Sequence, residues 1–169
     1  MRYWIKAALF AAGLAFSAGM AFAQDAAPSE GPLAAKLTVE RVVFDEESKK
    51  ETLVAAETAA PGDLLQYKGT YTNISEVPLA GLVVKGPIPS NTVFSEGGLS
   101  VSAKATLEVL IEGEPWQTLP AYKTVKQPDG KEERVVASPS DYKELRWKIW
   151  EALEPKETLV TIYRVKVEQ

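Results

Sequence analysis

The chain has 169 residues, of which 23 are acidic and 19 are basic, and it contains neither histidine nor cysteine. Its formal net charge is −4 at pH 7, and no dense block of Lys or Arg is present. This composition lacks the electrostatic footprint of a protein that binds nucleic acid or an anionic membrane. It also excludes disulfides and zinc sites built on His or Cys, so stability must come from buried apolar surface.

The first 23 residues follow the pattern of a secretory signal peptide. Arg2 and Lys6 give the segment a positive start, and residues 7–20 form an apolar run without a charge. This run is shorter than the stretch of about 20 apolar residues that a transmembrane helix needs. We therefore predict a cleaved N-terminal signal helix over residues 1–23, with a retained N-terminal anchor as the alternative.

The predicted cleavage site follows the apolar run. Ala21 and Ala23 flank a phenylalanine in the small-x-small arrangement that signal peptidase reads, so Gln24 becomes the first residue of the mature chain. Removal of two basic residues leaves 17 basic against 23 acidic residues, a net charge of −6. No cysteine is available for a lipid anchor, and no second long apolar run follows. These features predict a soluble mature chain, periplasmic or secreted, without an integral membrane span.

The rest of the chain divides into a lead-in and one domain. Residues 24–34 are rich in Ala, Pro, Ser and Gly and show no periodicity, as in a flexible linker. Residues 35–169 contain short runs of alternating apolar and polar residues, with no sustained helical period. Short strands at intervals of about ten residues are typical of sandwiches. The pattern predicts a single all-β domain, an antiparallel β-sandwich.

A type II turn is predicted at Pro61 and Gly62, since proline sets φ at the first corner and glycine takes the positive φ at the second. Asp63 completes the turn. The strand that follows alternates cleanly and places Tyr67 and Tyr71 on the same face.

Two irregularities are predicted from local patterns. The apolar phase of the first strand shifts by one residue near Glu40 and Arg41, which predicts a β-bulge there. Near the other end of the chain, an Asp-Gly pair predicts a hairpin between residues 122–125 and 134–136.

The middle of the chain is predicted as a strand, a break and a loop. Residues 79–85 read as a strand, which Pro87 and Pro89 end because proline cannot donate to a β-ladder. Residues 95–100 contain two adjacent glycines and are predicted as a loop.

Three motifs in the first half of the domain have the pattern of a bacterial family: Pro61-Gly62-Asp63, Tyr67-x3-Tyr71-x-Asn73 and Pro87-Ile88-Pro89-x2-Thr92-x-Phe94. Together they resemble the bacterial conserved-repeat domain, an envelope-associated domain of unknown function that is numbered eleven in its series. The second half is similar to the closing strands of single-domain members, in Asp141-Tyr142-x2-Leu145-Arg146-Trp147, Leu153-x-Pro155-x-Glu157 and Tyr163-Arg164-Val165.

The resemblance covers residues 37–169, nearly the whole domain. It implies an exported, immunoglobulin-like sandwich without a cofactor. It also implies that Asn73 ends a strand and bonds the turn that follows, although Asn73 begins an Asn-x-Ser triplet as well. Larger members of the family repeat the domain in tandem, whereas this chain has one copy, so a fibrous stalk is not expected.

The sequence offers little for catalysis or metal binding. Serines are present, but there is no histidine base and no Gly-x-Ser-x-Gly elbow, and a Ser-Lys pair with Lys104 has no supporting spacing. The acidic cluster at residues 45–47 and Asp129 could supply calcium ligands, yet lysines flank both, as in solvated loops. The many glutamates single out no glycosidase pair. We expect no enzyme activity, no metal and no cofactor.

The aromatic residues of the second half suggest a small-molecule site. Trp147 shares its face with Leu145 and Ile149, which predicts a core position, whereas Trp150 has the opposite parity and is expected to be partly exposed. Trp116 is predicted in a loop or at a strand edge. Exposed indoles could serve as flat platforms for sugar rings, although such rings often cap the ends of a sandwich instead.

These observations favour an exported, non-catalytic structural or protein-interaction module of the bacterial cell envelope. Its expected partner is an envelope protein or a glycan, and an edge strand could take up a partner strand. The first alternative is a carbohydrate-binding module that uses Trp116 and Trp150. The second alternative is an enzyme of unrecognised type.

Overall fold

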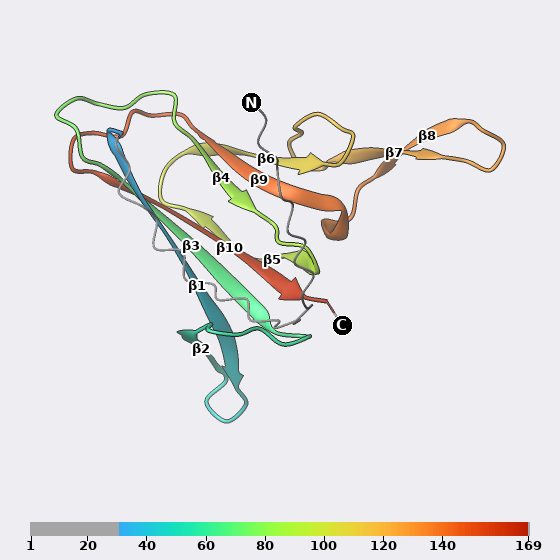
Figure 1. The fold of residues 1–169 in the computed structure, drawn as a ribbon, viewed down its shortest axis with the longest axis horizontal. Coiled ribbons are helices and arrows are strands. Elements are labelled where there is room, and N and C mark those ends of the chain that lie inside the picture. The colour runs from blue at the N-terminus through green and yellow to red at the C-terminus, as the bar shows by residue number, and fades with distance from the viewer. Residues whose placement is uncertain (1–30, 169) are drawn as a thin grey trace, which may run out of the picture.

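The computed structural model describes residues 31–168, which fold into an antiparallel β-sandwich (Figure 1). The predicted signal peptide, its cleavage site at Ala21, Ala23 and Gln24, and most of the predicted lead-in lie outside the described residues. Strand β1 begins at Leu33, so the last two residues of the predicted lead-in belong to the domain.

The described part of the chain forms ten strands and one short 3₁₀-helix. In chain order they are β1 (Leu33–Asp45), β2 (Lys50–Ala55), β3 (Leu64–Asn73), β4 (Val83–Pro87), β5 (Thr92–Val101), β6 (Ala105–Ile111), β7 (Tyr122–Lys126), β8 (Glu132–Val136), η1 (Pro139–Asp141), β9 (Tyr142–Ile149) and β10 (Thr158–Val167).

The strands pair into two sheets and a separate ribbon. The larger sheet has the order β2-β1-β3-β10-β5, and the smaller sheet has the order β4-β9-β6. Strands β7 and β8 pair only with each other and project away from the sandwich (Figure 1). If β2, β7 and β8 are set aside, the seven remaining strands divide four and three, as in constant-type immunoglobulin domains. Relative to that fold, the fifth and last of these strands, β6 and β10, exchange sheets.

The core lies between the inward faces of the two sheets. Inward-facing residues of β3, β9 and β10 supply half of its buried apolar residues, because successive side chains of a strand point to opposite faces. The largest fully buried apolar side chains are Leu65, Val109, Leu145, Trp147, Leu159, Tyr163 and Val165. Burial of one such side chain stabilises the fold by about 1.5–3 kcal/mol. No residue of β1 or β2 is fully buried, although Leu33 and Val39 of β1 are half-buried and pack against the core.

Tyr163 of β10 joins the two sheets. Its ring stacks on Tyr67 with the centroids 5.0 Å apart, and it meets Trp147 of the opposite sheet at 6.0 Å. Its hydroxyl donates a hydrogen bond of 2.8 Å to the carbonyl oxygen of Pro87. Gly86 leaves room for this contact, since a Cβ there would lie 2.7 Å from Cε1 of Tyr163.

The predicted bulge in the first strand is absent. The register of β1 against β3 runs without a shift from the pair Leu33–Asn73 to the pair Val42–Leu64. The apolar phase changes for a different reason: the last part of β1 pairs with β2, and all of β2 and the last three residues of β1 are exposed. Without a covering layer, burial does not impose a single apolar face on the strand.

The predicted loop at residues 95–100 is also wrong, because these residues belong to β5. The two glycines mark an irregularity within the strand instead. The register against β10 shifts between Ile162 and Arg164, and Gly98 has a φ of 84°. A Cβ at Gly98 would lie 2.5 Å from Nε of Arg164, so glycine makes room for that side chain.

The strand predicted at residues 79–85 begins later than expected. Strand β4 starts at Val83, while Leu79 forms only an isolated bridge with Leu153. Strand β4 ends at Pro87, as predicted. The Asp-Gly hairpin is confirmed, with β7 and β8 paired in register and a φ of 85° at Gly130.

Replacement of Gly86 by alanine should destabilise the sandwich by about 1–3 kcal/mol, because the added methyl group overpacks the contact with Tyr163. The free energy of unfolding in urea measures this loss. Gly97→Ala is the matched control, since a Cβ at Gly97 meets nothing within 4 Å. Equal midpoints for the two variants would contradict the assignment of Tyr163 as the joint between the sheets.

Candidate functional site

The outer face of the three-stranded sheet carries both tryptophans that the sequence singled out as ligand platforms. In β9, Leu145, Trp147 and Ile149 are buried, so the alternate residues Arg146 and Lys148 point outward. Pairing of β9 with its neighbours arranges the outer residues in rows across the sheet: Val83–Lys148–Thr106, Lys85–Arg146–Glu108 and Pro87–Glu144–Leu110. We call this surface, with Trp116 and Trp150, the tryptophan face.

Trp116 lies over the middle row of the tryptophan face. Gln117 next to it bridges to Val109 of β6 through two backbone hydrogen bonds of 2.8 and 3.0 Å, which fixes the segment after β6. The guanidinium carbon of Arg146 lies 4.2 Å from the ring centroid of Trp116, and Nζ of Lys85 lies 5.5 Å from it. Such cation–π contacts hold the indole flat against the sheet and leave it half-buried.

Trp150 stands at the end of β9 and is 68% exposed. Its backbone N–H donates to the carbonyl oxygen of Lys104 at 3.0 Å. Its indole Nε1–H donates to Oγ1 of Thr106 at 2.9 Å, so the ring is oriented although it is uncovered. Trp147, by contrast, is 2% exposed and belongs to the core, as its parity predicts.

On the tryptophan face, the lysine side chains are more exposed than the carboxylates with which they pair. Glu108 accepts from Nε of Arg146 and, at 3.0 Å, from Nζ of Lys148, while Lys85 pairs with Glu144 at 3.3 Å. The side chain of Glu108 is 12% exposed, whereas the side chain of Lys148 is 47% exposed. Solvent therefore meets the ammonium groups first. The hydrogen bond from Arg146, with further contributions from Lys148, lowers the pKa of Glu108.

The motif residues that carry the family resemblance have structural roles. The turn at Pro61 and Gly62 closes with a hydrogen bond of 3.0 Å from Asp63 N–H to the carbonyl oxygen of Ala60. Gly62 has a φ of 91°, and its N–H donates to Val167, which ties the turn to the last strand. Tyr67 is buried and Tyr71 is half-buried. Pro87 accepts from Tyr163, and Pro89 accepts from Oγ1 of Thr92 at 2.8 Å.

Asn73 is a fully buried polar hub at the end of β3. Its Nδ2 donates to the carbonyl oxygens of Val77 and Leu153, both at 2.8 Å. Its Oδ1 accepts from the N–H and the hydroxyl of Ser75, at 2.9 and 2.7 Å. The side chain thus bonds the turn that follows, which is the role that the resemblance implies.

The residues considered for metal or nucleophile chemistry have other partners. Asp45 accepts from the backbone N–H groups of Glu47 and Ser48 and so caps a turn, and these bonds lower its pKa. Asp129 caps the turn between β7 and β8. Lys104 forms an ion pair with Glu151 at 3.6 Å. Within residues 31–168, no group of three or more acidic side chains is placed to hold a metal ion.

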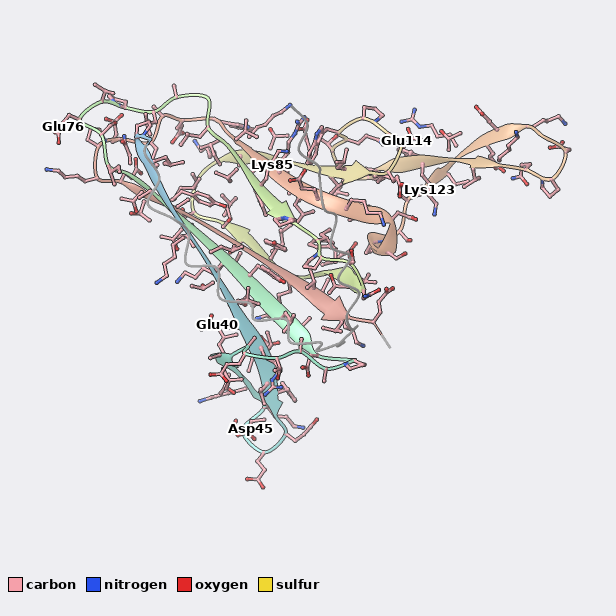
Figure 2. The ribbon with its side chains drawn as sticks, in the orientation of Figure 1. Glu40, Asp45, Glu76, Lys85, Glu114 and Lys123 are labelled. Carbon is pink, nitrogen blue, oxygen red and sulfur yellow. The ribbon has the colours of Figure 1, made fainter. Side chains whose placement is uncertain are left out.

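A second surface, which the sequence did not reveal, lies on the hairpin of β1 and β2. Four of its large apolar side chains are exposed: Val43, Phe44, Leu53 and Val54. We call these four residues the hairpin surface. In Figure 1 the hairpin extends downward, away from the three-stranded sheet, and Figure 2 shows Asp45 at its tip.

The β7–β8 ribbon is anchored at its root. Gln117 donates from Nε2 to the carbonyl oxygen of Tyr122 at 2.7 Å, and Glu114 accepts from the N–H of Thr124 at 2.8 Å. Lys123 forms an ion pair with Asp141 at 2.6 Å. Figure 2 shows Glu114 and Lys123 beside this root. The anchoring role of Gln117 was not predicted, since no local pattern marks it.

Comparisons with known proteins return no match: no protein-family model, no curated protein and no solved structure matches the chain significantly. None of the helices in the described residues is long and apolar enough to cross a membrane.

The ion pairs of Glu108 predict a specific pH dependence. Because the folded-state pKa of Glu108 lies below the unfolded value of about 4.3, the paired carboxylate stabilises the fold above that value. This stabilisation is lost as the pH falls through the folded-state pKa. The free energy of unfolding of Glu108→Gln should therefore fall less steeply than that of the wild type between about pH 5 and pH 3.

Urea unfolding at each pH measures these slopes. The matched control is Glu112→Gln, at an exposed carboxylate in the turn after β6, which should keep the wild-type slope. If the slope for Glu108→Gln equals that of the wild type, the ion pairs of the tryptophan face contribute nothing to stability.

Proposed function

We propose that the mature protein is an exported, non-catalytic protein-interaction module of the bacterial cell envelope, which binds a partner protein through the hairpin surface. The observation that carries the proposal is the set of four large apolar side chains left exposed where the end of β1 pairs with β2. Single exposed apolar residues are ordinary on a protein surface, whereas clustered ones mark interaction sites.

The apolar side chains lie on both faces of the hairpin. Directly opposed residues of an antiparallel pair share a face, so Leu53 lies with Val42 and Phe44 on one face. Val54 is opposed to Arg41 and therefore shares the other face with Val43. A partner strand that added to the free edge of β2 would place its alternate side chains against both faces. We therefore assign the partner an extended, partly apolar segment.

Polar contacts hold the hairpin in place despite its exposure. The guanidinium of Arg164, in β10, donates to both carboxylate oxygens of Glu51 in β2, at 3.2 and 2.8 Å. Nε of Arg164 donates to Oε1 of Gln66 at 3.0 Å. A bidentate pair of this kind fixes geometry as well as adding energy. A surface ordered before binding loses less conformational entropy when a partner arrives.

The predicted signal peptide and the resemblance to an envelope domain support the location that we propose. The same resemblance supports a role without a cofactor. The acidic mature chain, with its net charge of −6, also favours a protein partner over nucleic acid.

In-cell photo-crosslinking tests the proposal. A photoreactive amino acid at position 53, on the hairpin surface, should give one dominant adduct with an envelope protein. The control places the same amino acid at position 136, since Val136 is an exposed apolar residue on the β7–β8 ribbon. In a second step, Phe44→Ser should weaken the purified complex about tenfold or more, as loss of an apolar anchor costs about 1.4 kcal/mol or more.

Adducts of equal yield at positions 53 and 136, or an affinity that Phe44→Ser leaves unchanged, would contradict the assignment of the hairpin surface. Unfolding of the purified variant in urea shows whether it keeps the fold.

A further inference from the structure

We infer that the tryptophan face is a second binding site, independent of the hairpin surface, and that it binds a glycan that bears carboxylate groups. The site consists of the half-buried indole of Trp116, the exposed indole of Trp150 and the ammonium groups of Lys85 and Lys148 between and beside them.

The two indoles lie over neighbouring rows of the tryptophan face. Trp116 lies over Arg146 in the middle row, and Nε1 of Trp150 is bonded to Thr106, in the row that also contains Lys148. Neighbouring rows are two residues apart along β9, or about 7 Å. A short oligosaccharide that lies along β9 would thus meet both aromatic rings, with the ammonium group of Lys148 beside them.

The indole of Trp150 presents the chemistry that a sugar ring needs. Its N–H is already bonded to Thr106, so the uncovered part of the ring is its apolar π-face. The C–H bonds on one face of a pyranose pack against such a surface, and tryptophan supplies a large, rigid contact area at low entropic cost. The bond to Thr106 also orients the ring before the ligand arrives. An indole without such a bond would rotate freely and would lose more conformational entropy on binding.

The charge of the face selects for an acidic ligand. The less exposed members of its ion pairs are carboxylates, and the more exposed members are the lysines: Lys85 is 56% exposed and Glu144 is 24% exposed. Lys148 stands above Glu108 in the same way. A carboxylate on the ligand could therefore contact ammonium groups without approaching the protein carboxylates closely. One net positive charge over Lys85, Arg146, Lys148, Glu108 and Glu144 is too little for a phosphate polymer.

Affinity electrophoresis in native gels tests this inference, with polygalacturonate as the acidic probe and dextran as the neutral one. The wild-type mature protein should be retarded by polygalacturonate and not by dextran. Trp150→Ala and Lys148→Gln should each reduce the retardation at least several-fold. Because Trp150 is largely exposed, its loss should leave the urea midpoint near the wild-type value. Urea unfolding of Lys148→Gln shows whether that variant keeps the fold without its ion pair to Glu108. Phe44→Ala, which removes an exposed aromatic ring from the hairpin surface, should be retarded like the wild type.

Three results would overturn the inference: no retardation by polygalacturonate, equal retardation by dextran, or retardation that Trp150→Ala leaves unchanged. A further gel with dextran sulfate identifies general polyanion binding. Equal retardation of the wild type and Trp150→Ala in both acidic polymers would assign the effect to charge alone and refute the site. Because Phe44→Ala and Trp150→Ala act on separate surfaces, failure of this inference leaves the proposed protein interaction untouched, and the reverse also holds.

Discussion

The phenol of Tyr163 is the contact on which the sandwich depends. Its ring touches Tyr67 in its own sheet and Trp147 in the opposite sheet, and its hydroxyl reaches the backbone of β4 at Pro87. Burial, with smaller contributions from the neighbouring tyrosines and Glu144, raises its pKa, so the hydroxyl remains a donor at any physiological pH. This contact explains why residue 86 is glycine, since a Cβ there would clash with the ring of Tyr163. It also gives the carbonyl oxygen of Pro87, at the end of β4, its role as the acceptor of the phenol hydrogen bond.

The position of this joint also decides which surfaces remain open. The three-stranded sheet packs over the strands around β10, so the core extends only to half-buried residues of β1 such as Leu33 and Val39, while β2 is exposed throughout. Their hairpin is stabilised from the side by Arg164 and Glu51 instead of from above by a second layer. On the far side, Trp116 and Trp150 lie over part of the outer face of the smaller sheet. Both candidate binding surfaces thus follow from a sandwich with unequal sheets.

The sequence predicts the fold best where a strand is paired on both edges and has one face covered by the opposite sheet. Strand β10 alternates along its length and β9 alternates from Leu145 to Ile149, because one face of each meets the opposite sheet, and the alternation of β9 correctly places Trp147 inside and Trp150 outside. The errors occur where enclosure ends. Coverage is missing from Val43 onward in β1 and throughout β2, and the phase shift near Glu40 and Arg41 predicts a bulge that the structure lacks. The position of Trp116 depends on the pairing of Val109 with Gln117. The exposure of the hairpin surface depends on how far the second sheet extends. No local sequence pattern encodes either feature.

Residue-resolved amide hydrogen exchange of the mature protein tests the central claim. The claim is that local stability against opening is highest around Tyr163 and lowest at the two uncovered hairpins. Amides in the paired centres of β3, β9 and β10 should exchange only through global unfolding, while those at the free edge of β2 and at the tip of the β7–β8 ribbon should exchange through local opening, orders of magnitude faster. Protection of β2 equal to that of β10 would contradict the account, because it would mean that the hairpin surface is covered in the free protein.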